Sequence, residues 1–224
     1  MLCIIGAGGN MGRRYSAICQ LEKIAFTPID KNDPLPRNGD HTHFLITTPT
    51  DTHLKILDSL VANNINRMSI LIEKPLVNSL CLAELIAALK KARRLGHSVY
   101  MVNQYAYYSH GIADSEGPTY YDYYNSGKDG IFWDCIQLLY LARNGVPFLK
   151  NKSPIWHCMI NGVKLDRELI DLCYLKMLKD FITDGDTYGR HWYERDIIKA
   201  HKSVIEYEIN LNRHSSPFNF DEIA

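Results

Sequence analysis

Glycine is concentrated in one short segment near the start of the chain, Ile4-Ile5-Gly6-Ala7-Gly8-Gly9-Asn10-Met11-Gly12. The glycines are spaced GxxGxxG with a shorter GxG inside, and Met11 stands where a standard GxGxxG would have its third glycine. Glycine lets a backbone turn tightly and approach a ligand without a Cβ in the way, and a helix that follows offers unpaired amides to an anion. The segment therefore predicts a diphosphate site that uses Gly6, Gly8, Gly9, Asn10 and Met11.

A carboxylate follows at a distance that suits a dinucleotide. An expected strand, Lys23 to Ile29, ends at Asp30, 18 positions after Gly12. A carboxylate there accepts hydrogen bonds from both ribose hydroxyls of NAD and repels the 2′-phosphate of NADP, whereas Lys31 would attract that phosphate. We expect NAD or NADP as the cofactor, with NAD favoured. The alternative is a glycine turn kept for packing in an α/β protein without a ligand.

The elements that must position these residues alternate in the first half of the chain. Short apolar runs and helical patterns follow one another, which is typical of βαβ units and a parallel sheet. We expect strands at Leu2–Ile5, Lys23–Ile29, His43–Thr47, Met68–Ile72 and Ser98–Val102. Helices are expected at Asn10–Leu21, from Thr50 or Asp51 to Asn63, and between Ser79 and Gly96. Residues 1–103 are thus predicted to form a Rossmann domain, a doubly wound parallel α/β sheet.

The pattern changes from Gln104 onward. We expect strands at Thr119–Tyr124 and Trp156–Leu165, and helices at Ile131–Ala142, Asp166–Ile182 and His191–Tyr207. Residues 104–224 are predicted to be a small α+β domain for substrate binding and oligomerisation. A small open sheet would expose apolar surface, so a homo-oligomer that covers it is expected.

Three motifs in order carry a family resemblance. With the glycine turn, Thr48-Pro49-x-x-x-His53 and Glu73-Lys74-Pro75 at expected strand ends, the chain resembles the Gfo/Idh/MocA family of nicotinamide-dependent enzymes. The segment Tyr174-x-x-Met177-Leu178-x-Asp180-Phe181 looks like a later helix of that family. The resemblance implies hydride transfer between a nicotinamide and a sugar, cyclitol, polyol or related carbonyl or conjugated substrate. It also implies a cis peptide bond before Pro75.

The resemblance and the expected topology place the same residues near the cofactor. Ligands of open α/β sheets lie beyond the carboxyl ends of the strands, where these motifs fall. Besides the glycine turn and Asp30, the expected cofactor-binding residues are Thr47, Thr48, Pro49, His53, Glu73, Lys74 and Asn103. Lys74 is the expected main catalytic group, because an ammonium in a partly dry cleft can orient a substrate hydroxyl and pass a proton. The alternatives are a surface pair of Glu73 with Lys74, and a His53 that only caps or fills its helix.

The second half departs from the family pattern. Family members have an Asp followed four residues later by a His that does acid–base work, but here Asp134 is followed by Leu138. Lys74 would then handle the proton with Asp134 or with a tyrosine such as Tyr105, or the reaction needs no such group. Seven of the 14 tyrosines lie between Tyr105 and Tyr124, where they would line the cleft or simply form an amphipathic strand.

Composition excludes other classes of function. The chain has 25 Lys plus Arg and 25 Asp plus Glu, so it has no net charge to attract nucleic acid or anionic lipid. The six cysteines occur singly, and His157 has no second His or Cys at ligand spacing, so no metal site is expected. No signal peptide or membrane span is apparent. We expect a cytoplasmic protein with reduced thiols and a small-molecule substrate.

Three functions remain open at the level of the sequence. The first is an NAD(P)-dependent oxidoreductase. The second is a non-catalytic NAD(P)-binding sensor or degenerate relative, which the missing His and the short second domain favour. The third is redox-neutral use of tightly held NAD, as in epimerases or glycoside-cleaving lyases.

Overall fold

The computed structural model describes residues 1–37, 39, 41–107, 121–125, 136, 148–152, 157–160, 163–164, 166–183, 197–202 and 204–206. Asp134, Leu138, Tyr108, Tyr120 and most of the expected 131–142 helix lie outside the described residues. Of Tyr105 only the backbone is described.

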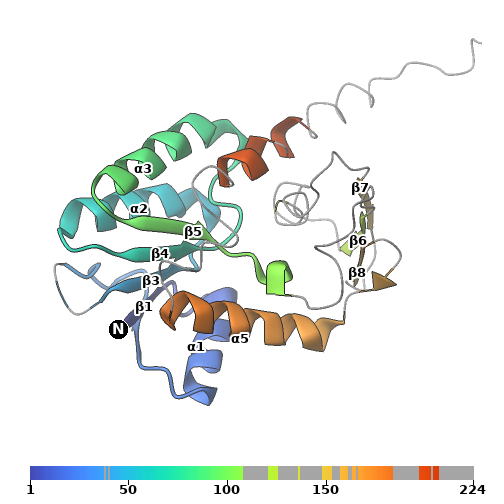
Figure 1. Ribbon diagram of the computed structural model, residues 1–224, viewed down its shortest axis with the longest axis horizontal. Helices are drawn as coiled ribbons and strands as arrows, with labels where there is room; N and C mark the ends of the chain where they lie inside the picture. The colour runs from blue at the N-terminus through green and yellow to red at the C-terminus, as the bar shows by residue number, and fades with distance from the viewer. Residues whose placement is uncertain are drawn as a thin grey trace, which may run out of the picture.

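Five parallel strands form the sheet of the first half (Figure 1). They are β1 (Leu2–Ile5), β2 (Phe26–Ile29), β3 (His43–Ile46), β4 (Ser69–Ile72) and β5 (Ser98–Met101). Their order is β2-β1-β3-β4-β5, and Leu2 of β1 pairs with Phe26 on one side and His43 on the other. The connections change direction between β1 and β3, and such a switch point is where open α/β sheets bind ligands. The predicted parallel α/β sheet is confirmed.

The start of the second strand was predicted wrongly. Lys23 has a left-handed backbone (φ 55°) and belongs to the turn that ends the first helix, α1 (Asn10–Leu21). The amide of Ile24 donates to the carbonyl of Cys19 (2.8 Å), so this stretch caps the helix instead of pairing with β1.

Helices cover both faces of the sheet. On one face lie α2 (Thr50–Asn63) and α3 (Leu82–Arg94), which begins after a short 3-10 turn η1 (Ser79–Cys81). On the other lie α1 and the later helix α5 (Arg167–Thr183). Alternate residues of β1 show the division, because Leu2 and Ile4 pack with α1 and α5, whereas Cys3 and Ile5 pack on the side of α2 and α3. The inner strands β1, β3 and β4 are mostly apolar because both faces of the sheet are covered there, whereas the edge strand β2 is only partly buried.

Helix α5 completes the core of the first half although it lies far along the chain. The fully buried Phe181 meets His43 and Tyr100 edge-on, with ring centroids 5.2 and 6.1 Å away. In the middle of the helix, Tyr174 packs edge-on against Tyr15, and the Arg14 guanidinium lies 4.3 Å from the centre of the Tyr174 ring. The apolar core therefore crosses the predicted boundary at residue 103, which marks a change of sequence pattern.

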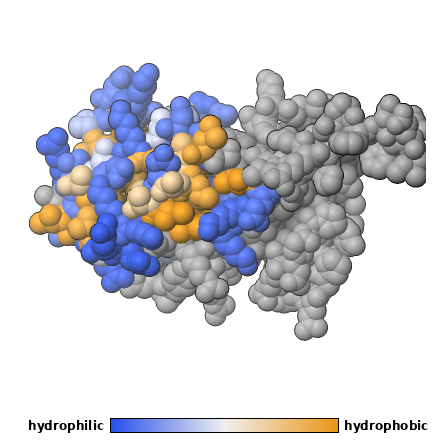
Figure 2. Space-filling view, turned by 90° about the horizontal axis from the view of Figure 1, so that it is seen from above, coloured by the Kyte–Doolittle hydropathy of each residue, from blue (hydrophilic) through white to orange (hydrophobic). Residues whose placement is uncertain are grey.

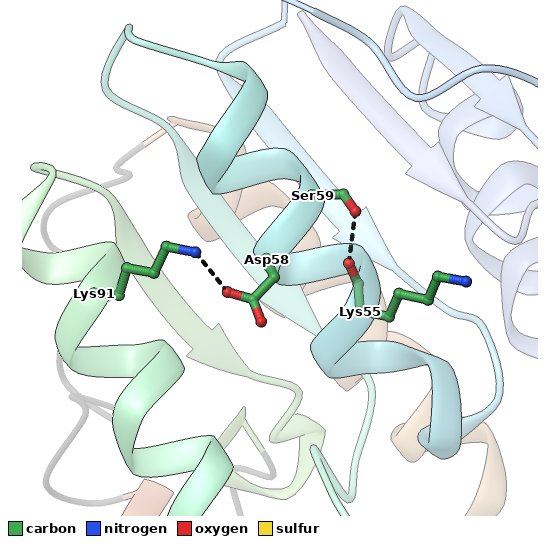
Figure 3. Close-up of polar contacts among 4 residues, drawn as sticks. All are labelled: Lys55, Asp58, Ser59 and Lys91. Atoms are coloured by element: carbon green, nitrogen blue, oxygen red, sulfur yellow. Dashed lines mark hydrogen bonds and ion pairs between the residues drawn. The ribbon is translucent and has the colours of Figure 1, made fainter.

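Polar side chains of α2 and α3 lie at the protein surface, among them the exposed Lys55 and Asp58 (Figure 3). Lys91 of α3 pairs with Asp58 of α2 at 2.9 Å, and the Ser59 hydroxyl donates to the carbonyl of Lys55 (2.8 Å). Because the ion-paired side chains are 43% and 52% exposed, this ion pair contributes less than about 1 kcal/mol to stability. Figure 2 shows polar and apolar residues interspersed on the face that it views.

A second, four-stranded sheet lies in the later half of the chain. Its strands are β6 (Tyr121–Asn125), β7 (Phe148–Lys152), β8 (His157–Ile160) and β9 (Val163–Lys164), in the order β7-β6-β8-β9. The pair β6–β7 is parallel and the other pairs are antiparallel. The prediction of a single strand over Trp156–Leu165 was wrong, because β8 and β9 pair as a hairpin on either side of Asn161-Gly162.

No helix in the described part of the chain has the length and apolarity that a membrane crossing needs.

Candidate functional site

The glycine turn joins β1 to α1 in a shape that only glycine permits at two positions. Gly6 is left-handed (φ 86°), and a Cβ there would lie 2.8 Å from Cγ2 of Thr48. At Gly12 a Cβ would lie only 2.1 Å from the carbonyl oxygen of Gly6, so this glycine lets α1 approach the strand end. Gly12 thus has the role that the third glycine has in a standard GxGxxG turn, which is to allow close packing of helix and strand. It was not among the predicted site residues, although the GxxGxxG spacing pointed to it.

The N-terminus of α1 is open. Gly9 is its N-cap and has no side-chain cap hydrogen bond, and the first turn has no acidic residue. The turn's own amides are used internally, since those of Gly6 and Ala7 donate to the carbonyl of Ile29 (2.8 and 3.1 Å). The amides of Asn10 and Met11 have no intrahelical acceptor. Because Gly8, Gly9 and Asn10 are exposed, this helix start suits an anionic group.

Asp30 lies beside the glycine turn, as predicted. Its Oδ2 accepts the Gly8 amide hydrogen (2.9 Å), and a Cβ on Gly8 would lie 2.2 Å from the same oxygen. The amide of Asp30 in turn donates to Oδ2 of Asp33 (2.8 Å). Two carboxylates therefore stand together at the end of β2. Asp33 was missed, although the Asp-x-x-Asp spacing in a loop is a turn signal.

The end of β3 supports the glycine turn from behind. The hydroxyl of Thr47 is buried and lies 3.0 Å from the carbonyl oxygen of Ile5 and 3.1 Å from that of Gly6. Its hydrogen is therefore used within the protein. Thr48 accepts a hydrogen bond from the Thr52 hydroxyl (2.8 Å), and Pro49 is the N-cap of α2.

Glu73, Lys74 and Pro75 follow β4, and the bond between the last two is cis. Glu73 is buried, with its Oε1 accepting from the Tyr15 hydroxyl (3.0 Å) and its Oε2 from the Lys74 amide (3.2 Å). Burial raises the pKa of Glu73, and Lys74 and Tyr15 act against that rise. Because Glu73 is buried, the alternative that Glu73 and Lys74 form an ion pair on the surface is wrong for Glu73. Lys74 itself is half-buried at the strand end.

His53 contacts the backbone of two segments that contain proline, Thr48-Pro49 and Lys74-Pro75. It is 1% exposed, with Nε2 2.7 Å from the carbonyl oxygen of Thr48 and Nδ1 3.1 Å from that of Pro75. Burial lowers the pKa of His53, while these carbonyls and Asp51 act in the opposite direction. The ring therefore contacts the backbone of two separate segments, and its contact with the cofactor stays a prediction.

Unsatisfied polar groups mark the end of β5. Asn103 and Gln104 are 0% and 2% exposed, yet both amide atoms of Asn103 and Oε1 of Gln104 lack a hydrogen-bond partner among the described residues. Buried polar groups are costly without a partner, so such atoms at a strand end suggest a ligand. Asn103 was predicted to bind the cofactor, whereas Gln104, its neighbour in the same segment, was not among the predicted cofactor-binding residues.

The short 3-10 turn η2 (Gln104–Tyr107) follows directly and carries Tyr105. The Tyr107 side chain is hydrogen-bonded to Asp180 of α5, and burial with this carboxylate raises the pKa of Tyr107. Helix α5 thus fixes the segment that leaves β5. No group of three or more His, Cys, Asp and Glu side chains that could hold a metal occurs in the ranges described above.

The chain is similar in fold to solved dehydrogenase structures over most of its length, although no protein-family model and no curated protein matches the sequence. The WlbA (WbpB) dehydrogenase from Thermus thermophilus, in complex with NAD and UDP-GlcNAcA, has a TM-score of 0.63 and 14% identity over 92% of this chain and 94% of that one. An oxidoreductase from Agrobacterium radiobacter, in complex with NAD+, L-tartaric acid and magnesium, has a TM-score of 0.67 and 10% identity over 95% and 96%. A myo-inositol dehydrogenase from Corynebacterium glutamicum has a TM-score of 0.59 and 13% identity over 90% and 93%. The chain therefore has the fold of Gfo/Idh/MocA-type dehydrogenases, the fold that the sequence resemblance implied.

Proposed function

We propose that the protein is an NAD(P)-dependent oxidoreductase of the Gfo/Idh/MocA type. It transfers hydride between a nicotinamide and a small polyol, sugar-like or carbonyl or conjugated substrate. The observation that carries the proposal is the open start of α1, which lies at the β1/β3 switch point with Asp30 beside it. The structural neighbours with bound NAD support the same assignment.

The residues present fit a dinucleotide along its length. The amides of Asn10 and Met11 would hold the diphosphate, and Asp30 would accept the ribose hydroxyls. Since the side chain of Asn103 has no hydrogen-bond partner among the described residues, its donor and acceptor together match a carboxamide such as that of nicotinamide.

When bound, the nicotinamide would supply a hydride donor or acceptor. The chain's own contribution is to orient the substrate and move a proton. Lys74 would orient the substrate hydroxyl and exchange its proton, while the buried Glu73 holds the backbone amide of Lys74. Tyr105, in η2 next to Asn103, and Asp134, outside the described residues, are the proposed supporting groups.

A titration with NADH tests the cofactor proposal. Saturable enhancement or a blue shift of the reduced-cofactor fluorescence is expected. No change up to millimolar NADH would refute the dinucleotide site.

A non-catalytic sensor is the second candidate, because Leu138 occupies the place where the family has a catalytic His. Turnover separates the two. An oxidoreductase would reduce NAD with at least one member of a polyol and sugar panel, or oxidise NADH with an oxo-acid or another carbonyl or conjugated compound. A sensor would bind the cofactor stoichiometrically without turnover.

The preference for NAD depends on the carboxylate pair at the end of β2. Replacing Asp30 by alanine is expected to weaken NADH binding about tenfold to a hundredfold, because a charged hydrogen-bond acceptor for the ribose is lost. NADPH binding should weaken less or improve, since repulsion of the 2′-phosphate falls. Parallel fluorescence titrations with both cofactors measure the ratio. The matched control is Asp58→Ala on the exposed side of α2, which should change neither affinity; equal losses for both cofactors in Asp30→Ala would contradict the assignment.

A further inference from the structure

A buried histidine of the last described helical segment contacts the backbone beside Lys74. His201, in residues 197–202, is 0% exposed, and its Nε2 accepts the amide hydrogen of Leu76 (3.2 Å) across 125 positions of sequence. Its Nδ1 lies 2.8 Å from the carbonyl oxygen of Ile197. Because a carbonyl only accepts and an amide N–H only donates, the ring must carry its hydrogen on Nδ1 and its lone pair on Nε2.

The ring stays in that neutral form over the working range of pH. Burial lowers the pKa of His201 to about 4, although the carbonyl of Ile197 acts in the opposite direction. The Leu76 amide therefore has a permanent acceptor. Leu76 is 0% exposed, so water does not replace that acceptor when it is removed.

The segment from Glu73 to Leu76 is held from three sides. Tyr15 of α1 donates to the side chain of Glu73, and His53 of α2 contacts the carbonyls of Pro75 and Leu76 (3.1 and 3.3 Å). The third contact comes from the later half of the chain, where Nε2 of His201 accepts the hydrogen of the Leu76 amide. Its own segment packs into the core of the first sheet through the buried Ile197 and Ala200, and Val204 of residues 204–206 joins the same core.

We infer that His201 is a positioning residue for Lys74, acting through the Leu76 amide. This inference rests on the proposed function, because it assigns His201 to the same reaction. A residue of the later half of the chain thereby fixes the position of Lys74, the proposed proton-transfer group. In this role the His201 ring contacts neither substrate nor cofactor.

Two variants separate the contacts of the ring. In His201→Asn the side-chain amide reaches only as far as Nδ1, so the bond to Ile197 is kept and the acceptor for Leu76 is lost. In His201→Gln the amide oxygen reaches the place of Nε2 and can accept the Leu76 hydrogen. With the panel compound that the wild-type protein turns over, we expect kcat to fall about tenfold in His201→Asn and to stay within about threefold of wild type in His201→Gln. The Kd for NADH should stay within about threefold in both, since the glycine turn is untouched.

Hydrogen exchange of residues 73–77, followed by mass spectrometry on the full chain, measures how firmly this backbone segment is fixed. The measurement does not require turnover. Faster exchange in His201→Asn, with protection restored in His201→Gln, supports the proposal when kcat follows the same order. A residue that is only structural would lower the thermal midpoint in both variants and leave kcat of the folded protein unchanged, and that result overturns it. If His201→Asn does not fold, His201→Leu replaces it. A wild-type protein without NADH binding or turnover would instead refute the proposed function, and the positioning role would fall with it.

Discussion

Lys74→Met is expected to lower kcat by about 10²- to 10⁴-fold, the range that general acid–base catalysis contributes. Methionine keeps the length of the side chain but has no proton to exchange with a substrate hydroxyl. The Kd for NADH should change less than about threefold, because the open helix start and Asp30 remain in place. Steady-state kinetics with the panel compound that is turned over, together with an NADH fluorescence titration, measures both quantities.

The matched control for this prediction is Lys55→Met, which removes an exposed lysine from the outer side of α2 (Figure 3). It should leave kcat and the Kd for NADH unchanged. If Lys74→Met kept more than about a third of the wild-type kcat, Lys74 would not be the proton-transfer group, because even a weak general acid or base contributes far more than this. Tyr105 and Asp134 would then be tested in its place.

The first sheet could be predicted because its inner strands β1, β3 and β4 are buried on both faces. Such strands are continuous apolar runs, and the helices between them have one apolar side, so local pattern identifies each element. Local pattern does not reveal which distant helix covers a face. The spacing of Tyr174, Met177 and Phe181 predicts a helix, but nothing in it indicates that α5 packs on β1 and β5. The hairpin of β8 and β9 was missed for a different reason, because the Asn161-Gly162 turn signal was overlooked within an apolar run.

The candidate site was predictable where it depends on strand ends. Parallel strands bring their carboxyl ends to one edge, so Gly6, Asp30 and Glu73 could be placed near one another from the order of the elements. Residues that act through distant partners were not predictable. Tyr15 meets Glu73 across 58 positions and His201 meets Leu76 across 125, and neither pairing leaves a local signal. The sequence therefore indicated which groups could do chemistry, but not which groups hold them in place.

Gly12→Ala is expected to cost about 3 kcal/mol of unfolding free energy, at the upper end of the range for overpacked sites. The new Cβ would lie 2.1 Å from the carbonyl oxygen of Gly6 and 2.7 Å from Cα of Ala7. Both are backbone atoms, so relief requires α1 to move away from β1 rather than a side chain to rotate. That movement displaces the amides of Asn10 and Met11, and NADH binding should weaken more than about tenfold, because the diphosphate is held by fixed amide positions. Urea unfolding and NADH titration measure the two effects.

Gly96→Ala separates this clash from the general cost of replacing a glycine. Gly96 is left-handed (φ 82°), but a Cβ there would meet nothing within 4 Å. Its cost should be about 1 kcal/mol, that of a left-handed non-glycine residue, and NADH binding should be unchanged. If Gly12→Ala cost no more than Gly96→Ala and bound NADH normally, α1 could approach β1 less closely without harm. The start of α1 would then not be the element that holds the diphosphate, and the dinucleotide site would have to lie elsewhere along the carboxyl edge of the sheet.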